Sequence, residues 1–577
     1  MTTAPKARRS QLISTYGVGG LFPSENASFM IVGLQDWDVS RAESASEPRL
    51  ARSLGVTSLL MPPAGGRRDV PVIRFPQMQT CPECRRIGRP ADFRSPWNQS
   101  TCNLCRPSAP LTPSRLIVAC SRGHAGEFPY FSWAHAGLGE RSADEHELTL
   151  RSRGRTSSLA DLILECTCGV PPVGLDGAFE STALKGITRC LGERPWLGPE
   201  SKEGCSETPR TLQRGASNVW FPAVRSVISI PPFSEALARF VDREWSILKE
   251  PQAVDTPWLI KTLVDKCRGR FTAEAIIAET RRRHAYEDSE TEVSEAGLRQ
   301  DEYKALLEGR QEGRDGSDFV CLIRQVPDDV SQYLSDVRKV TRLREVRALY
   351  GFSRLQAVSD SEDKRLCALS ARKEAWLPAI EVRGEGVFLV VDPERSSNWA
   401  ATSFAAARRR QLQSASNAAD NAAQRPQSRL VDVRHIMLHT LAHVLIDQLA
   451  LDAGYPAASI RERLFVDESM SGILLYTATS DSAGSLGGLA ALAEPEKLGR
   501  LLVDGLRRLS WCSSDPVCIE STGTGTDGLN LAACHACVLA PETSCEEQNI
   551  LLDRATLFGT PEAPDAGFFS TLISAAM

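Results

Sequence analysis

Seventeen cysteines, most of them crowded into two windows, dominate this 577-residue sequence. Fourteen lie within residues 81–205 and 512–545, and only three lie elsewhere. Basic residues near the start are not followed by the apolar segment of a secretory leader. The sequence also contains no run of about 18 apolar residues, so we expect a cytoplasmic protein without a membrane span. In a reducing compartment, clustered cysteines indicate bound metal in preference to disulfides.

The first window opens with two CxxC pairs. Cys81 and Cys84 form one pair, Cys102 and Cys105 form the other, and seventeen residues separate them. This spacing is typical of a zinc ribbon. Each pair can present two thiolates from one tight turn, and two such turns supply a tetrahedral shell around Zn²⁺. A closed four-thiolate shell has no open position, so we predict a structural ion.

The rest of the first window offers a second metal set with competing ligands. We predict that it consists of four cysteines, namely Cys166, Cys168, Cys190 and Cys205. Cys120 and His124 form a CxxxH motif that could complete a mixed site instead, with His135 and His146 following downstream. The alternative for His124 is a histidine that is hydrogen-bonded in a turn.

The second window contains five cysteines for one predicted zinc site. Cys534 and Cys537 form a CxxC pair, and Cys545 is the expected third ligand. Cys518 is our choice for the fourth ligand, with Cys512 as its alternative. A lone CxxC can also be a redox motif, but flanking cysteines favour metal here. Together the two windows predict two to three zinc ions.

The sequence predicts a multidomain α/β protein of mixed α+β type that carries zinc-ribbon-type modules. Residues 220–230 and 376–391 are typical of strands, whereas 301–312 and 330–350 show apolar residues at helical spacing. Residues 399–428 are polar and poor in large apolar groups, which suggests a linker or a long polar helix. We therefore expect five segments: 1–75, a cysteine-rich region at 76–232, a mainly helical region at 233–398, a linker at 399–429 and a final domain at 430–577.

Sequence motifs for common catalytic sites are missing. The chain has neither a P-loop GxxxxGK[ST] nor a GxSxG nucleophile elbow. His435, His439 and His443 recur every four residues on one expected helix face, but Thr440 stands where a zinc protease needs glutamate. We expect packing histidines and no enzyme. The alternative is a metal-dependent nuclease or hydrolase that adds Glu462 or Asp467 to this helix.

A short basic stretch is the candidate nucleic-acid contact. Arg151, Arg153 and Arg155 alternate, so an extended backbone would place them on one face, where they could meet successive phosphates. The net charge of −5 does not indicate a free-standing DNA-binding protein. A solvated face is the ordinary alternative for such arginines.

Seven short motifs follow one another in the last part of the chain: LHTLAH (438–443), RERL (461–464), GILLYT (472–477), LGGL (486–489), CSSDPVC (512–518), ACHAC (533–537) and LDR (552–554). Together they resemble the MrfA-like zinc-binding domain, which is found at the C-terminus of some DNA helicases. The resemblance implies metal ligands at Cys534, Cys537 and Cys545, with Cys518 or Cys512 as the fourth.

Further motifs precede these along most of the chain: GVG (17–19), CSRGH (120–124), FPY (128–130), LQRGASN (212–218), RLREV (342–346) and EVRGEG (381–386). In this order they resemble the DrmB family of the bacterial DISARM anti-phage system. This resemblance implies a complex with a separate helicase subunit, DrmA, which hydrolyses ATP and binds DNA. We therefore expect a non-catalytic zinc-binding subunit that contacts DNA through that complex.

Overall fold

The computed structural model describes most of the chain, and the expected mixed α/β architecture is confirmed. The described chain forms two compact units. Unit 1 comprises Met1–Ser46, Leu50–Ser226 and Arg347–Ile380, and unit 2 comprises Glu47–Arg49, Val227–Val346 and Glu381–Met577. The five predicted segments stay a prediction. The described residues are 6–24, 26–66, 69–96, 99–136, 146–154, 161–289, 293–313, 316–358, 363–422, 429–477, 487–525 and 528–576.

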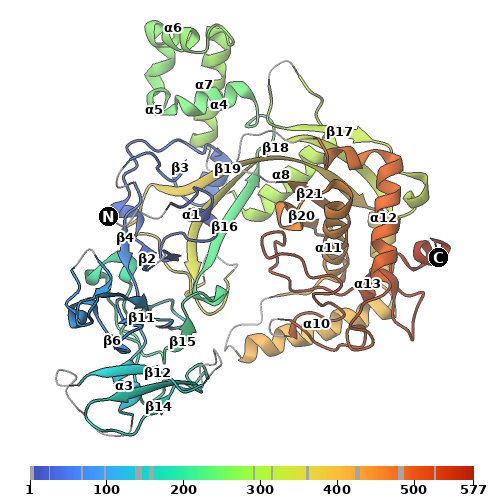
Figure 1. The fold of residues 1–577 in the computed structure, drawn as a ribbon. Coiled ribbons are helices and arrows are strands. Elements are labelled where there is room, and N and C mark those ends of the chain that lie inside the picture. The colour runs from blue at the N-terminus through green and yellow to red at the C-terminus, as the bar shows by residue number, and fades with distance from the viewer. Residues whose placement is uncertain are drawn as a thin grey trace. The chain divides into compact units, whose positions relative to one another are not determined.

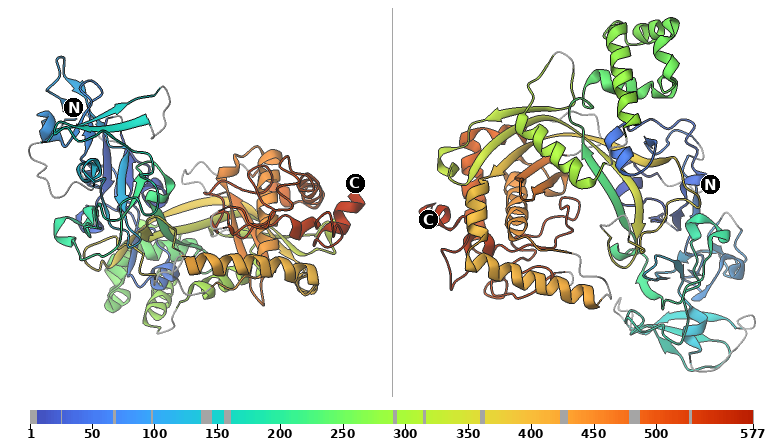
Figure 2. Two further views of the ribbon diagram at one scale, coloured as in Figure 1. Left: turned by 90° about the horizontal axis from the view of Figure 1, so that it is seen from below. Right: turned by 180° about the vertical axis from the view of Figure 1, so that it is seen from behind.

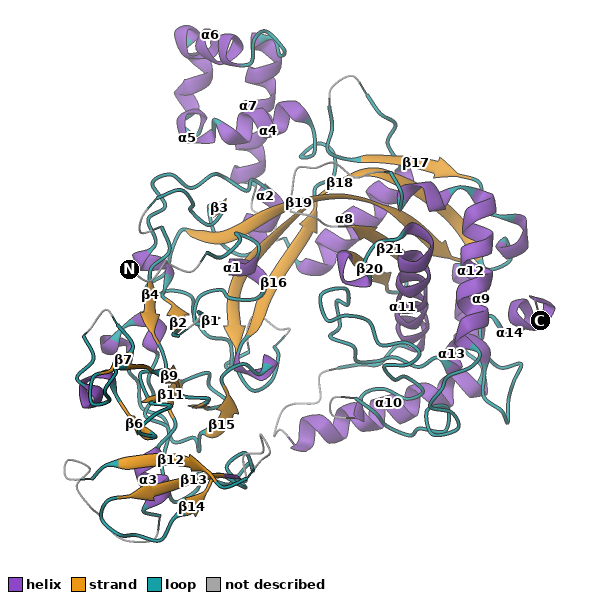
Figure 3. Ribbon diagram, in the orientation of Figure 1, coloured by secondary structure: helices purple, strands orange, loops and turns teal. Residues whose placement is uncertain are grey.

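Short strands in small sheets make up most of unit 1. The sheet orders are β1-β2-β4, β11-β10-β15, β14-β13-β12-β6-β5-β9 and β7-β8. The short helix α3 packs on β13, as Figure 3 shows. Such small sheets bury little apolar surface, so loops between them need other crosslinks. The strands are β1 (Leu21–Pro23), β2 (Ser28–Ile31), β3 (Ser58–Leu60), β4 (Val72–Arg74), β5 (Gln79–Thr80), β6 (Arg86–Gly88), β7 (Thr101–Cys102), β8 (Ala109–Pro110), β9 (Thr112–Pro113), β10 (Leu116–Ala119), β11 (Ala125–Glu127), β12 (Leu148–Ser152), β13 (Leu162–Cys166), β14 (Val173–Gly174) and β15 (Arg210–Gln213).

The largest sheet has the order β16-β18-β19-β21-β20, with β17 beside β18 and β3 beside β19. Strands β19 and β21 are antiparallel, with Phe388 opposite Leu474. The predicted strands at 220–230 and 376–391 are confirmed by β16 and β19. The strands are β16 (Phe221–Ile228), β17 (Val320–Arg324), β18 (Leu334–Ser353), β19 (Trp376–Val391), β20 (Ile460–Val466) and β21 (Ser471–Thr477).

The helix expected at residues 330–350 is wrong, because the structure has strand β18 there. Val337, Val340 and Val346 are buried, and β-branched residues favour a pleated strand over a helix. Two arginines that the helical spacing would place on a polar face, Arg338 and Arg344, are buried instead. Arg344, for example, forms an ion pair with Glu381 on the neighbouring strand. The many charged residues of this buried strand therefore led the sequence analysis to predict an amphipathic helix.

Helices of unit 2 surround one long apolar helix, α11. It begins after Asp432, whose carboxylate accepts the Arg434 backbone N–H, and it ends at Gly454 in the left-handed conformation. Figures 1 and 2 show α11 beside β20, β21 and α12. Helix α11 spans Val433–Ala453, and the other α-helices of the described residues are α1 (Gln11–Ser14), α2 (Pro48–Ser53), α3 (Tyr130–Ala134), α4 (Ala236–Arg243), α5 (Trp245–Leu248), α6 (Pro257–Lys266), α7 (Ala273–Asp288), α8 (Glu295–Glu308), α9 (Pro393–Ala400), α10 (Ser403–Ala422), α12 (Pro495–Leu509), α13 (Ala555–Phe558) and α14 (Ser570–Ala576).

Two of these helices, α10 and α11, bear on expectations from the sequence. Helix α11 is long and apolar enough to cross a membrane by length and composition, although 72% of its most apolar window is buried within the fold. That burial is typical of a core helix. Of the alternatives for residues 399–428, the long polar helix is the one found at 403–422, as α10.

Candidate metal centres

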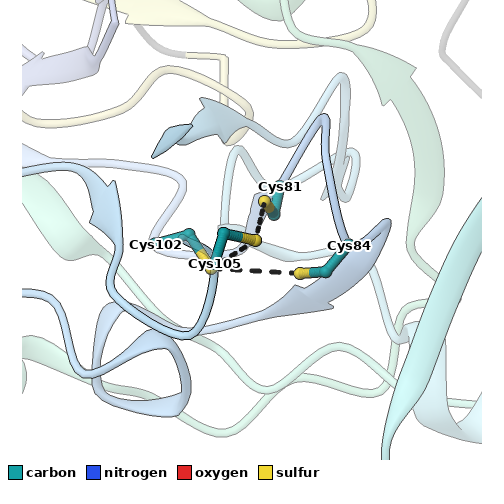
Figure 4. A group of neighbouring side chains, drawn as sticks. All are labelled: Cys81, Cys84, Cys102 and Cys105. Carbon is teal, nitrogen blue, oxygen red and sulfur yellow. Dashed lines mark hydrogen bonds between the residues drawn. The ribbon is translucent and has the colours of Figure 1, made fainter. Parts of the chain in front are cut away.

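The two CxxC pairs of the first window converge on one point in unit 1. We call Cys81, Cys84, Cys102 and Cys105 cluster A, and Figure 4 shows their sulfur atoms turned toward one another. The turn after β5 carries the first pair, whereas Cys102 ends β7 and Cys105 lies in the turn that follows it. Arg85 takes a left-handed backbone conformation that turns the chain back into β6.

The sulfur separations in cluster A match a shared tetrahedral ion. Cys81 Sγ lies 3.7 Å from Cys105 Sγ, and Cys84 Sγ lies 3.9 Å from Cys102 Sγ. A disulfide would require about 2.05 Å. Four thiolates at about 2.3 Å from zinc are about 3.8 Å apart. Neutral thiols attract one another only weakly, whereas a shared metal ion would bring four sulfur atoms to these distances. The four donors therefore fit zinc.

Cluster B, also in unit 1, consists of Cys120, His124, Cys190 and Cys205. The Nδ1 atom of His124 lies 3.3 Å from Cys120 Sγ and 3.5 Å from Cys190 Sγ. Its other nitrogen, Nε2, lies 2.9 Å from the Glu203 carboxylate. A carboxylate behind a histidine fixes the tautomer and orientation of a metal-binding imidazole.

Electrostatics within cluster B favour a thiolate. The adjacent Cys120 thiol lowers the pKa of Cys190 to about 4, and the same contact raises the pKa of Cys120 well above its usual range. The Gly192 backbone N–H also points at Cys190 Sγ, at 3.4 Å. One thiolate is therefore available near neutral pH, as zinc binding requires.

Cluster C joins His135, His146, Cys166 and Cys168, again in unit 1. Helix α3 ends at His135, whose Nδ1 donates to the Phe131 carbonyl at 2.8 Å. This leaves its Nε2 free to lie 3.3 Å from both Cys168 Sγ and His146 Nδ1. Burial raises the pKa of Cys168, but backbone N–H donation from Val170 and the nearby His135 outweigh it and lower the pKa to about 7.

The predicted second set is therefore divided between two clusters. Cys166 and Cys168 belong to cluster C, whereas Cys190 and Cys205 belong to cluster B. The structure brings Cys120 and His124 together with Cys190 and Cys205, the arrangement of the CxxxH alternative, and metal binding there stays a prediction. Antiparallel pairing of β12 with β13 separates the pairs, because it carries Cys166 back beside the start of β12.

Cluster D lies in unit 2 and consists of Cys512, Cys518, Cys534 and Cys537. Three sulfur pairs, 512–534, 518–537 and 534–537, are 3.5–3.7 Å apart. Burial raises the pKa of Cys534, but the Ala536 backbone N–H and neighbouring thiols lower it to about 7 overall. The cluster contains both Cys512 and Cys518, which the sequence had treated as alternatives.

Cys545, the expected third ligand of that set, lies elsewhere in unit 2. It joins His439, His443 and Glu462 in cluster E, and all four side chains are buried. Helix α11 supplies the histidines from consecutive turns, and β20 supplies the carboxylate. His435, one turn earlier, is not part of the cluster.

Charges within cluster E depend strongly on one another. Burial favours neutral imidazoles, but the Glu462 carboxylate overrides it, raises the pKa of His443 to about 9 and raises that of His439 well above its usual value. The same contacts outweigh burial at Glu462 and hold its pKa well below the usual range. Opposite charges therefore stabilise one another in a fully buried place.

The basic stretch is only partly described. Arg151 lies on β12 and Arg153 just beyond it, both exposed, whereas Arg155 lies outside the described residues. The Arg151 guanidinium pairs with Glu165 on the neighbouring strand at 3.2 Å. A role in phosphate binding stays a prediction.

The fold and clusters define a mixed α/β protein with several cysteine-rich modules that are compatible with zinc. Residues 8–221 match a domain of unknown function, DUF8724, and residues 441–538 match the MrfA Zn-binding domain. The chain is 33% identical over 568 residues to the DISARM protein DrmB of Bacillus paralicheniformis (strain ATCC 9945a / NCIMB 11709 / CD-2). The aligned region covers 95% of this chain and 100% of that relative. The chain therefore belongs to the DrmB family.

Proposed function

We propose that this chain is a non-catalytic, zinc-stabilised subunit of a DISARM-type anti-phage complex in the cytoplasm. Its partner would be a DrmA-like helicase that hydrolyses ATP, and it would help that helicase to hold DNA. The observation that carries this proposal is the similarity to a DISARM protein over nearly the whole of both chains. The sequence has no P-loop of its own, so ATP hydrolysis would belong to the partner.

Clusters A to D are the proposed zinc sites. Each offers four thiolate or imidazole donors, which are the ligands that structural zinc prefers. This would make four ions, one more than the largest number expected from the sequence. Four protein ligands fill a tetrahedral shell, so these ions would fix loops and leave no coordination position for a substrate.

The alternative is a metal-dependent nuclease or hydrolase built on the histidine helix. His439, His443 and Glu462 do converge, but His435 does not join them and Cys545 takes the fourth place. A catalytic metal keeps an open position that solvent and substrate can reach. The donors of cluster E are at most 5% exposed, which favours a structural role.

Co-purification with a DrmA-like helicase tests the proposal. We expect the two chains to elute together, and we expect ATP hydrolysis from the helicase and from the pair but none from this chain. ATP or nucleic-acid turnover by this chain alone, lost in a His439→Gln variant that stays folded, would favour the alternative.

A further inference from the structure

We propose that cluster E is a fifth zinc site, buried in the core of unit 2. The ligands would be His439 Nε2, His443 Nε2, one Glu462 carboxylate oxygen and Cys545 Sγ. The matched MrfA Zn-binding region, residues 441–538, contains all of cluster D but reaches neither His439 nor Cys545. The inference goes beyond the proposed function and does not depend on it.

The Glu462 carboxylate is buried in an apolar environment and therefore requires a positive charge nearby. Its neighbours two residues away on β20, Ile460 and Leu464, both belong to the apolar core around α11, so Glu462 shares their face of the strand. An isolated carboxylate in such surroundings costs several kcal/mol. The two histidines of α11 and Cys545 surround this carboxylate, and a cation placed among them would compensate it.

Hydrogen-bond accounting points to a cation at the centre of the cluster. His443 Nδ1 lies 2.9 Å from the Val538 carbonyl, which can only accept, so Nδ1 carries the proton. Metal binding requires the neutral imidazole, in which Nε2 carries a lone pair and faces Glu462 Oε1, another acceptor, at 3.5 Å. This Nε2 is buried and makes no hydrogen bond among the described residues. A metal ion accepts both electron pairs at once.

The thiol is held as a ligand thiolate would be. Backbone N–H groups of Glu547 and Asn549 point at Cys545 Sγ from 3.3 and 3.2 Å. Residues on either side of Cys545 are joined to β20, since Glu462 N donates to the Ser544 carbonyl and Glu546 N donates to Glu462 Oε1, both at 3.0 Å. The backbone therefore positions the carboxylate and the sulfur together.

Distances and charge both fit zinc. His439 Nε2 lies 3.2 Å from Cys545 Sγ and 3.2 Å from Glu462 Oε1. Ligands at about 2.0–2.3 Å from zinc are about 3.3–3.8 Å apart in a tetrahedron. One thiolate and one carboxylate neutralise Zn²⁺, so the filled site would carry no net charge, as burial in the core favours.

Metal analysis and cadmium NMR on the full-length protein test this site. We expect five zinc ions per chain, and four in His439→Gln and Cys545→Ser variants. His435→Gln, one turn away on the same helix and outside the cluster, should keep five. In protein loaded with ¹¹³Cd, each thiolate ligand moves the resonance downfield. Cluster E, with one thiolate, should therefore give a signal upfield of clusters A to D.

The wild-type spectrum tests the proposal even if a ligand variant fails to fold. A fully loaded protein without a one-thiolate resonance would show a metal-free network of ion pairs and would overturn the inference. An unchanged metal count in folded His439→Gln and Cys545→Ser proteins would do the same. Neither result would bear on co-purification with the helicase, so the two proposals can fail separately.

Discussion

His443 donates through Nδ1 to the backbone carbonyl of Val538, 2.9 Å away. Val538 directly follows Cys537, so this hydrogen bond joins the CxxC turn of cluster D to helix α11. The two clusters of unit 2 therefore share a structural element. A disturbance of the turn should reach the imidazole that faces Glu462.

Loss of cluster D should weaken metal binding at cluster E. In Cys534→Ser the turn loses its ion and its rigidity, and the Val538 carbonyl no longer holds His443 in place. Partners behind a ligand contribute about 10–100-fold to metal affinity. We expect loss of one zinc and about this decrease in the affinity of the cluster E ion, measured by competition with a chelator. Cys84→Ser in cluster A is the matched control, and an equal effect there would argue against the link.

The carboxylate behind His124 should set the zinc affinity of cluster B. Glu203→Gln keeps the size of the side chain but removes its charge, so we expect zinc to be bound about 10–100-fold more weakly. Chelator competition measures this directly. Glu193→Gln changes an exposed carboxylate nearby that pairs with Lys202 and should leave the affinity unchanged. Equal affinities in wild type and Glu203→Gln would show that the carboxylate does not support the ligand.

A buried ion pair should contribute strongly to the stability of unit 2. Arg463 forms two hydrogen bonds to Glu302, at 2.7 and 2.8 Å, and both side chains are buried. Arg463→Met leaves the Glu302 carboxylate buried without a counter-charge. We therefore expect the free energy of unfolding to fall by about 3–5 kcal/mol, measured by denaturant titration.

A second change should recover much of that loss. Adding Glu302→Gln removes the unpaired charge but keeps an oxygen for the Ile228 backbone N–H, which donates to Glu302 at 2.8 Å. Arg324→Met breaks a partly exposed pair with Glu494 and should cost about 1 kcal/mol or less. A double variant no more stable than Arg463→Met would contradict this explanation.

The exposed arginines Arg151, on β12, and Arg153, just beyond it, should contribute to DNA binding by the complex. Each phosphate contact adds about 0.9 to the slope of log affinity against log salt concentration. Replacing Arg151 and Arg153 with alanine should therefore lower that slope by about 1–2 and weaken binding to all sequences alike. Arg281→Ala removes an exposed arginine on α7 and should not change the slope. An unchanged slope in the double variant would mean that these arginines only face solvent.

Cysteine spacing predicted that the two neighbouring CxxC pairs meet, but it did not predict the partners of the more distant cysteines. The ribbon pairs of cluster A were predictable because each CxxC turn is local. The partners of Cys166 and Cys545 depend on strand pairing and on a core helix far away in the sequence. One signal was present for cluster E: Glu462 is a charged residue between Ile460 and Leu464, on the apolar side of a strand.

Periodicity was reliable for apolar strands and misleading for charged ones. Residues 376–391 contain a continuous apolar run and form β19, as predicted. Residues 334–353 alternate charged and apolar groups irregularly, and two of their arginines are buried against partners elsewhere in the fold. Arg344 pairs with Glu381 on β19, and Arg338 donates to the Leu307 carbonyl of α8. Partners that are distant in the sequence cannot be identified from the residue pattern. The pattern of a buried strand rich in ion pairs therefore resembles that of a helix with a solvated face.

The spacing of the ligands along the chain implies an order in which the metal sites can form during synthesis. Cys81 and Cys105 are 24 residues apart, whereas His439 and Cys545 are 106 residues apart. Synthesis releases the N-terminal end first, so the ribbon can capture its ion while the ribosome is still translating the rest. The buried centre cannot form until Cys545 has been synthesised, so its ion would be bound well after the ion of the ribbon.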